Sequence, residues 1–180
     1  GVLTLGVGVA SQVVPVTPID DSAVESNENV IVSVSAAPYY ELGSGGAVVT
    51  IVSDDQPSDL LVTTLTGPAT AGAGASITVN DTTKNQGQGT SSVSATGFYL
   101  STNTTIDASD FNLGTRDVPS LTPGMTNSAA SVLTVPSNIG VGNYYLLAKA
   151  DVAGAVTESN ESNNVKMGSI VAVGPELMVQ

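Results

Sequence analysis

The sequence contains no histidine, no cysteine and no tryptophan, and only four of its 180 residues are lysine or arginine. Without histidine and cysteine, a histidine general base, a thiolate nucleophile and a zinc site with nitrogen or sulfur ligands are excluded. Four cations cannot form the basic surface that replaces phosphate counterions, so a nucleic-acid partner is excluded as well. The oxygen ligands that remain suit hard cations such as calcium.

Aromatic residues are scarce, at 4%, and no apolar run approaches the roughly 20 residues that a membrane-spanning helix needs. We therefore expect no membrane insertion, and cores built from aliphatic side chains. Residues 1–10 lack the basic start of a signal peptide, so secretion cannot be read from them directly. The absence of cysteine fits a cytosolic protein and a bacterial surface protein equally well. The many serine, threonine, asparagine and glycine residues, with little lysine, favour an extracellular or cell-surface location.

Short apolar runs, separated by glycine, proline, asparagine and serine, predict an all-β fold of the sandwich or barrel kind. The polar, proline-containing stretch 53–58 predicts the boundary between two domains in tandem. The first domain would take residues 1–55 and the second residues 59–173, with a short linker at 56–58. The expected strands span residues 2–9, 12–17, 29–36, 47–52, 59–66, 75–79, 94–101, 129–135, 142–152 and 165–173.

A trace of an internal repeat links the start of the second domain to the end of the chain. Pro57-Ser58-Asp59-Leu60-Leu61-Val62 and Pro175-Glu176-Leu177-Met178-Val179 both contain a proline, an acid and the opening of an apolar strand. Arrays of β-modules repeat in this way. Residues 174–180 are therefore expected to start a following strand or repeat.

Acidic residues outnumber basic ones by 16 to four, and the first domain contains a dense group of them. Four acids lie within residues 19–28, directly before an expected strand, and Asp54 and Asp55 follow the next one, while residues 1–55 contain no lysine or arginine. If both strands belong to one sandwich, these acids converge at one of its ends, where a divalent cation would neutralise them. The alternative stays open, because aspartates also form turns and glutamates also form a solvated surface.

The same residues carry a resemblance to a known family. Val16-Thr17-Pro18-Ile19-Asp20-Asp21, then Glu25 and Glu28, and later Tyr40-Glu41-Leu42-Gly43 with the terminal Asp54-Asp55, resemble the pattern of the Calx-β domain family. The resemblance implies an immunoglobulin-like sandwich that binds calcium. It covers about residues 1–55, which correspond to the C-terminal part of a full domain, so the first domain is expected to be incomplete. The metal ligands that the resemblance implies are Asp20, Asp21, Glu25, Glu28, Asp54 and Asp55.

Two further groups of oxygen ligands lie in the second domain. Asp151, Glu158 and Glu161 surround an expected hairpin turn, and Asp107 and Asp110 lie in an oxygen-rich loop. Each group could bind a second cation. The alternative is a plain connecting loop, whose asparagine and serine side chains cap backbone groups.

The second domain carries a series of motifs, most specifically the closing run Glu158-Ser159-Asn160-Glu161-Ser162-Asn163-Asn164. The others are Asp59-Leu60-Leu61-Val62, Asn85-Gln86-Gly87, Phe98-Tyr99-Leu100-Ser101, Leu113-Gly114, Val118-Pro119-Ser120-Leu121-Thr122-Pro123-Gly124, Gly142-Asn143-Tyr144-Tyr145-Leu146 and Asp151. Together they resemble the CARDB family, a bacterial domain linked to cell adhesion. This resemblance implies an immunoglobulin-like sandwich of extracellular proteins without catalytic residues, so the fold class expected for the whole chain is two immunoglobulin-like β-sandwiches in tandem. Residues 97–101 and 142–148 carry aromatic side chains and are expected to face each other in the core. Residues 80–84 depart from the family pattern, which continues a strand with apolar residues, and a bulge there would reconcile the two.

These observations predict a structural and adhesive segment of an extracellular multidomain protein or fibre, stiffened by calcium near the domain junction. The expected partners are neighbouring domains or subunits of the same protein, which could add strands at open sheet edges. The alternative is a carbohydrate-binding module of a secreted enzyme, for which exposed Tyr39 or Tyr40 would supply the aromatic platform. The chain itself is not expected to be an enzyme, because its clustered carboxylates suit a metal better than a cleft.

Overall fold

The protein is an all-β molecule in which no described residue is helical, as the sequence predicts. The structure, a computed structural model, describes residues 13, 15–17, 24–33, 46–53 and 55–174. Within these ranges there is no helix long and apolar enough to cross a membrane. The chain divides into two compact units, residues 1–55 and residues 56–180.

The first unit contains one antiparallel pair of strands, β1 (Glu28–Ser33) and β2 (Gly46–Ile51). Glu28 pairs with Ile51 and Ser33 with Gly46, so the start of β1 lies beside the end of β2. The prediction of a strand over 12–17 is wrong for its described residues, which form no strand. Pro15 accounts for this, because it cannot donate a ladder hydrogen bond. The strand expected at 2–9 lies outside the described residues.

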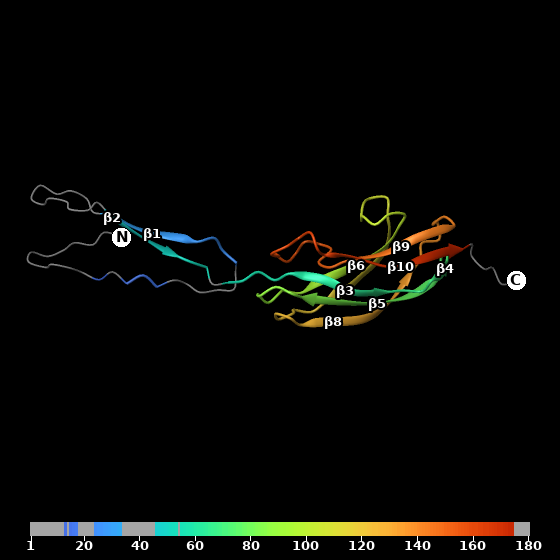
Figure 1. The fold of residues 1–180 in the computed structure, drawn as a ribbon, viewed down its shortest axis with the longest axis horizontal. Coiled ribbons are helices and arrows are strands. Elements are labelled where there is room, and N and C mark those ends of the chain that lie inside the picture. Colours follow the sequence, from blue (N-terminus) through green and yellow to red (C-terminus); the bar gives the residue numbers. More distant parts are fainter. Residues whose placement is uncertain (1–12, 14, 18–23, 34–45, 54, 175–180) are drawn as a thin grey trace, which may run out of the picture. The chain divides into compact units, whose positions relative to one another are not determined.

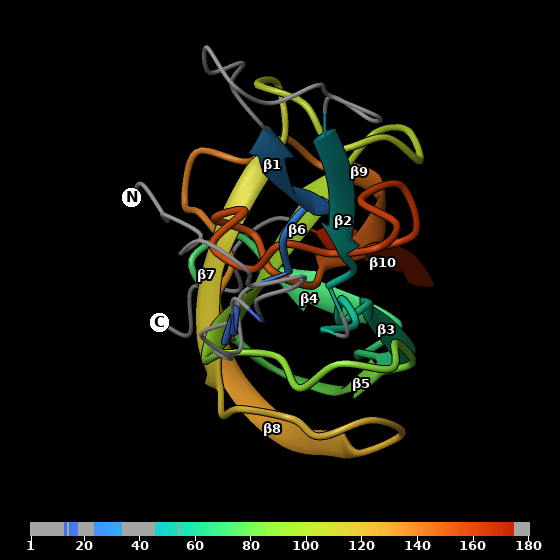
Figure 2. The same cartoon turned by 90° about the vertical axis from the view of Figure 1, so that its left-hand side faces the viewer.

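The second unit is a sandwich of two sheets. One sheet has the order β3-β5-β8 and the other the order β4-β10-β9-β6-β7. Figure 2 shows β5 and β8 in one layer and β6 and β9 in the other. The strands are β3 (Leu60–Thr66), β4 (Thr70–Gly72), β5 (Ser76–Asn85), β6 (Ser94–Ser101), β7 (Phe111–Val118), β8 (Thr126–Thr134), β9 (Gly142–Lys149) and β10 (Val165–Gly174).

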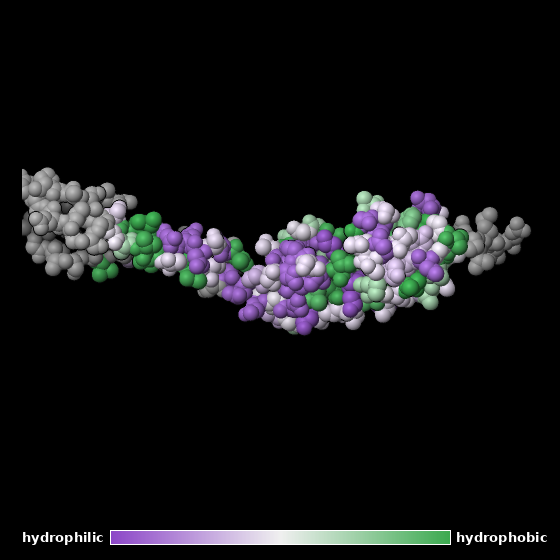
Figure 3. Space-filling view, turned by 45° about the horizontal axis from the view of Figure 1, so that its top comes forward, coloured by the Kyte–Doolittle hydropathy of each residue, from purple (hydrophilic) through white to green (hydrophobic). Residues whose placement is uncertain are grey.

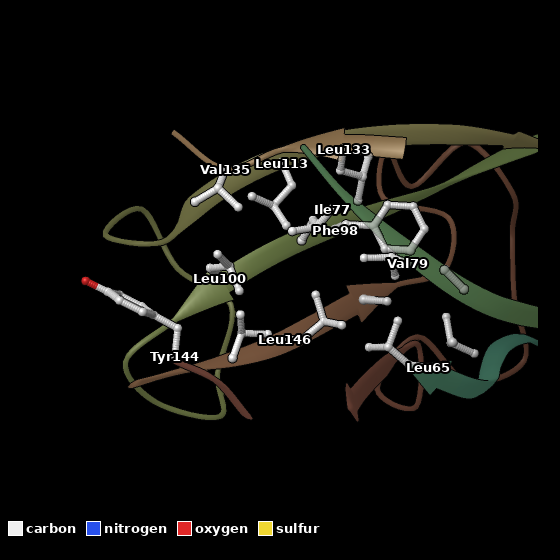
Figure 4. Close-up of a cluster of buried hydrophobic side chains, with 14 of the residues drawn as sticks. Leu65, Ile77, Val79, Phe98, Leu100, Leu113, Leu133, Val135, Tyr144 and Leu146 are labelled. Carbon is white, nitrogen blue, oxygen red and sulfur yellow. The ribbon is translucent and has the colours of Figure 1, made fainter. Parts of the chain in front are cut away.

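The core of this unit lies between the two sheets and consists mainly of aliphatic side chains. Buried and less buried residues alternate along most of β5, as expected for a strand with one face on the core. Leu60, Val79, Phe98, Leu100 and Leu146 are completely buried. Figure 4 shows side chains from both sheets pointing toward one another. Burial of apolar surface, at about 25 cal/mol per Å², is therefore the main force that holds the layers together.

The aromatic strands are arranged differently from the expectation. β6 and β9 do not face each other across the core but pair side by side in one sheet, with Tyr99 opposite Leu147. Tyr144 instead contacts Phe111 in an edge-to-face arrangement, with ring centroids 5.9 Å apart. The Tyr144 hydroxyl, at the edge of the cluster in Figure 4, donates a hydrogen bond to the Gly140 carbonyl over 3.0 Å.

The polar stretch 80–84 continues β5 without a bulge of its own. The irregularity lies opposite, in β3, between Val62 and Thr64, so the expectation of a bulge within 80–84 is wrong in its position. The stretch remains a strand because its inward side chains, Asp81 and Thr83, find polar partners in the interior. Two strands, β4 and β7, are not among those the sequence predicts.

The chain enters and leaves the second unit at opposite ends. β3 begins at Leu60, opposite Asn85, the last residue of β5. β10 ends at Gly174, which pairs with Gly72 in the short strand β4. Figure 1 shows the start of β3 at one end of the sandwich and the ends of β4 and β10 at the other. We call these the N-terminal and the C-terminal end of the unit.

Candidate functional site

The N-terminal end of the second unit holds a dense group of polar contacts. Three stretches meet there: the N-terminal segment 56–60, the turn 85–89 that ends β5, and the loop 158–164 that precedes β10. We call this group the N-terminal clamp. Figure 3 shows hydrophilic residues gathered around this end of the unit.

The turn 85–89 binds the N-terminal segment through backbone hydrogen bonds. The amides of Gln88 and Gly89 donate to the Pro57 carbonyl over 3.2 and 3.1 Å, and the Gln86 amide donates to the Asp59 carbonyl over 2.8 Å. A Cβ atom at Gly89 would lie 1.7 Å from the Gln56 carbonyl oxygen. The approach of the two backbones therefore requires glycine at this position.

Asn85 supports this turn from inside the protein, where it is completely buried. Its Oδ1 accepts hydrogen bonds from the amides of Asp59 and Gly87, and its Nδ2 donates to the carbonyls of Gly89 and Leu121. One side chain thus satisfies four backbone groups that would be costly to bury unpaired.

The loop 158–164 holds the segment from the other side, mainly through Glu158. Its Oε1 accepts a hydrogen bond from the Leu60 amide over 2.6 Å, and its Oε2 accepts one from Asn164 Nδ2. The Ser159 amide donates to the Ser58 carbonyl over 2.9 Å, and Ser58 and Glu158 form a parallel β-bridge. The loop therefore pairs with the segment as a short parallel strand would.

Burial raises the pKa of Glu158 above its usual range. The hydrogen bonds from Asn164 and Leu60 act against this rise, while the nearby charges of Glu161 and Asp151 add to it. The folded protein therefore binds a proton at this carboxylate more tightly than an exposed glutamate would.

Asp59 ties the two sides of the clamp together. Its Oδ1 accepts a hydrogen bond from Asn163 over 2.7 Å and its Oδ2 one from Gln86 over 3.0 Å. Asn163 and Gln86 belong to different stretches of the clamp, so a single carboxylate in the N-terminal segment links both. The side chain is 8% exposed, which makes these partners necessary.

The metal ligands predicted in the first unit are placed only in part. Glu25 and Glu28 are exposed, and the Glu25 amide donates to Ser53 Oγ over 3.5 Å, so both glutamates lie beside the end of β2. Asp55 is half-buried. The remaining predicted ligands, Asp20, Asp21 and Asp54, lie outside the described residues. In the described part of the chain, no three acidic side chains gather closely enough to hold a metal ion.

The weaker ligands predicted in the second unit are engaged in local hydrogen bonds. Both oxygens of Asp151 accept backbone amides, from Ala155 over 3.2 Å and from Val156 over 2.9 Å. Asp151 adopts a positive φ of 39°, so its carboxylate stabilises an unusual backbone turn. The Glu161 carboxylate accepts the Glu158 amide over 3.3 Å.

Asp107 and Asp110 form a turn that closes on itself. Asp110 Oδ2 accepts the Asp107 amide over 2.9 Å, while Asp107 Oδ1 accepts both the amide and the hydroxyl of Ser109. The hydrogen bonds from Ser109 hold the pKa of Asp107 below its usual range. A similar pattern occurs at Asn160, whose Oδ1 accepts from the Ser162 amide, so the capping interpretation of loop 158–164 is confirmed at that residue.

An ion pair that the sequence did not predict joins the two sheets. The guanidinium of Arg116, on β7, donates to both carboxylate oxygens of Asp81, on β5, over 2.7 and 2.6 Å. It also donates to Asn127, on β8, over 2.6 Å. The side chains of Arg116 and Asp81 are 8% and 0% exposed. Because Arg116 neutralises and hydrogen-bonds the buried Asp81, the polar half of β5 can lie in the interior of the unit.

The described residues form an open groove but no exposed aromatic surface that could bind a small molecule such as a sugar. An open groove of about 1040 Å³ lies at the C-terminal end, between β4 and the start of β5, and is lined by small residues and no charged side chain. The five described aromatic residues are all buried or half-buried, so none offers an exposed platform for a sugar. Tyr39 and Tyr40, on which the carbohydrate alternative rests, lie outside the described residues.

Comparison with known families identifies the second unit. The CARDB family model matches residues 57–168, which is more than half of the chain. The chain belongs to the CARDB family. The resemblance predicted from the sequence is thereby confirmed for the second unit, which we call the CARDB unit. The resemblance of residues 1–55 to Calx-β domains stays a prediction. No curated protein matches the sequence.

Among solved structures, the chain is similar to the CARDB domain of a Pyrococcus furiosus protein that was crystallised with di-metal ions. The two are 24% identical, with a TM-score of 0.48, over 66% of this chain and 90% of that one. A domain of a predicted cell surface protein from Methanosarcina acetivorans is also 24% identical, with a TM-score of 0.44, over 66% of this chain and 93% of that one. A β-glucosidase from Listeria innocua is 17% identical, with a TM-score of 0.43, and the match covers 79% of this chain and 18% of the enzyme.

The sequence indicated some members of the clamp but not their roles. The sequence predicts Glu158 and Glu161 as candidate cation ligands, and Asn85-Gln86-Gly87 is one of the motifs that resemble the CARDB family. The pairing of Glu158 with Leu60, which lies 98 positions away, carries no local signal. The signal that the sequence does carry is compositional: asparagines and acids are concentrated in residues 158–164, directly before β10, and Asp59 lies directly before β3.

Proposed function

We propose that the chain is a structural and adhesive segment of an extracellular multidomain protein or fibre at the cell surface, in which the CARDB unit acts as a spacer. Its partners would be neighbouring domains or subunits of the same protein. No catalytic step is part of this proposal. Membership of the CARDB family supports it, as does the use of the polar groups at the N-terminal end for backbone contacts.

The observation that carries the proposal is the path of the chain through the CARDB unit. The chain enters beside Asn85 and leaves beside Gly72, at opposite ends of the sandwich. A domain with this path extends a tandem array by its full length. The N-terminal clamp supports the same role, because it fixes the segment that precedes β3 to the body of the unit.

Strand addition by a neighbouring subunit would use β8. It is an edge strand of its sheet, with nine residues and no charged side chain. Uncharged edge strands without proline can be extended by another chain, whereas charged ones resist it. The exposed Val132 in this strand, at 74% exposure, would then be covered.

Surface labelling of intact cells tests the location. Antibodies raised against the chain are expected to label unpermeabilised cells of the source organism, and external protease is expected to remove the label. Labelling that appears only after permeabilisation would contradict an extracellular segment. Antibodies against a cytosolic protein of the same cells are the control for membrane integrity.

Calcium would stiffen the first unit near its end. The support is the register of β1 and β2, which brings Glu25 and Glu28 beside the stretch that leads to Asp54 and Asp55. Calcium would bind there with a Kd on the order of 10⁻⁴–10⁻³ M, as in other extracellular modules. Calcium at 100 times its Kd would add about 2.7 kcal/mol to the unfolding free energy of the structure that binds it.

Calorimetry in calcium and in EDTA tests this part of the proposal. The melting temperature of the unit that contains these acids is expected to rise with calcium, and not with the same concentration of magnesium. The variant Glu25→Gln/Glu28→Gln should reduce the rise, whereas Asp117→Asn, an exposed acid of the CARDB unit, should leave it unchanged. Identical melting in calcium and in EDTA would mean that calcium has no structural role.

A further inference from the structure

Each end of the CARDB unit contains a parallel contact between two stretches of the chain. The pairings among the other named strands are antiparallel, whereas β4 pairs with β10 in parallel. The isolated bridge between Ser58 and Glu158 is also parallel. Both parallel contacts join the first part of the unit, residues 58–72, to its last part, residues 158–174.

These contacts are held by hydrogen bonds at opposite ends of the sandwich. At the N-terminal end, the Ser159 amide donates to the Ser58 carbonyl over 2.9 Å and the Leu60 amide to Glu158 over 2.6 Å. At the C-terminal end, the Ala172 amide donates to the Ala69 carbonyl over 2.9 Å, and Gly174 pairs with Gly72.

The direction of the chain decides how tension would act on these bonds. Residues 58–72 and 158–174 both run from the N-terminal to the C-terminal end. A pull on the two ends of the unit therefore drags the first part backward and the last part forward, so that they slide past each other. Hydrogen bonds between parallel strands are evenly spaced and slant from one strand to the other, so sliding strains all of them together rather than one after another.

We propose that the two parallel contacts form a mechanical latch, which resists unfolding when the chain is stretched from end to end. The latch consists of the contact of 58–60 with 158–163 at one end and of β4 with β10 at the other. Asp59 reinforces the first contact, because Asn163 donates to its carboxylate over 2.7 Å. The inference rests on the proposed function, since only a segment in an extended array would experience such a pull.

Force spectroscopy along two pulling directions tests the latch. The full chain contains no cysteine, so pairs of engineered cysteines attach handles at defined positions. The pair Gln56→Cys/Gly174→Cys pulls on opposite ends of the unit and shears the latch. The pair Gln56→Cys/Ser162→Cys pulls on two positions at the same end of the unit, so the contacts at that end separate one after another. We expect a rupture force at least about twofold higher for the first pair at the same pulling rate. A melting curve of each variant checks that the CARDB unit is folded.

A pair of single substitutions adds an independent readout. Glu158→Ala removes the acceptor of the Leu60 amide, and we expect it to lower the end-to-end rupture force. Glu161→Ala, an exposed acid in the same loop, should lower it less. Equal rupture forces for the two pulling directions would overturn the latch, as would an unchanged end-to-end force in Glu158→Ala. Either result would leave surface labelling of cells unaffected, so failure of the latch and failure of the proposed function are distinguishable.

Discussion

Glu158 shows at the scale of one residue how this acidic chain uses a carboxylate without a cation. Both of its oxygens accept hydrogen bonds, yet burial and two neighbouring acids raise its pKa. Asn164 Oδ1, buried beside it, has no hydrogen-bond partner. If the Asn164 amide were reversed, this oxygen could accept a hydrogen bond from a neutral group at position 158. The site therefore accommodates a neutral side chain as well as a charged one.

We predict that Glu158→Gln flattens the dependence of stability on pH. Because the folded-state pKa of Glu158 is raised, its contribution to stability is fully present below the unfolded-state pKa. That contribution is lost as the pH rises through the folded-state pKa. A glutamine cannot titrate, and it keeps both hydrogen bonds once the Asn164 amide reverses. Urea unfolding from pH 4 upward should show a smaller loss of stability in the variant, which at pH 7 should lie within about 1 kcal/mol of the wild type.

The matched control is Asp117→Asn, an exposed carboxylate on β7 that does not contribute to the raised pKa of Glu158, and it should follow the wild-type curve. If Glu158→Gln loses as much stability as the wild type over the same pH range, the raised pKa does not contribute to the stability of the unit.

Gly89 is the second residue whose role can be tested alone. We predict that Gly89→Ala lowers the unfolding free energy by about 1–3 kcal/mol, because the added Cβ would lie 1.7 Å from the Gln56 carbonyl oxygen. The same substitution at Gly140, where the nearest atom would be 3.6 Å away, should change stability by less than about 0.5 kcal/mol. Urea unfolding of both variants checks this. Equal stability of the two would show that the turn can move away from the N-terminal segment without cost.

At the scale of strands, β5 and β7 show why an ion pair can replace an apolar core contact. Arg116 and Asp81 are almost fully buried and bind each other through two hydrogen bonds. A buried pair costs desolvation, and the mutual attraction and added hydrogen bonds offset that cost. Removal of one partner leaves the other charge buried and unpaired, which is worse than removal of both.

We predict that Asp81→Leu and Arg116→Met each destabilise the protein by about 3–5 kcal/mol, and that the double variant loses less than either. Urea unfolding of the two single variants and the double variant measures the coupling between the positions. Asp117→Ala, an exposed neighbour of Arg116, should change stability by less than about 0.5 kcal/mol. Additive losses in the double variant would show that the two charges do not stabilise each other.

These strands also show where sequence reasoning reaches its limit. The strands with regular apolar alternation, such as β3 and β10, could be predicted to within a residue or two. The second half of β5 and all of β7 could not, because their inward positions include Asp81 and their sequences contain glycine, asparagine and arginine. Polar residues become acceptable in a core only when a partner lies opposite, and that partner is known only from the fold. The clamp follows the same rule, since the partners of Glu158 and Asp59 lie far away in the sequence.

At the scale of the whole molecule, the hydrophobic core of the described residues lies entirely in the CARDB unit. Each buried hydrophobic residue of the described part lies between Leu60 and Val173. In the first unit, the strand residues are mostly exposed, including Ile31 at 72% and Val48 at 61%. A two-stranded sheet without a covered face is only marginally stable. In the absence of calcium, the CARDB unit is therefore expected to carry most of the measurable stability of the chain.

We predict that a fragment of residues 56–180 folds by itself, with an unfolding free energy within about 1 kcal/mol of that of the CARDB unit in the full chain. The reason is that its core, its ion pair and its N-terminal clamp all lie within the fragment. Urea unfolding followed by the NMR signals of Phe98 and Tyr144, two buried core residues of this unit, compares the two proteins. The control is a fragment of residues 61–180, which lacks Ser58, Asp59 and Leu60. Because these residues are the partners of Glu158 and Asn163, this fragment should unfold at a lower urea concentration. A fragment 56–180 that is much less stable than the full chain would show that residues 1–55 support the CARDB unit.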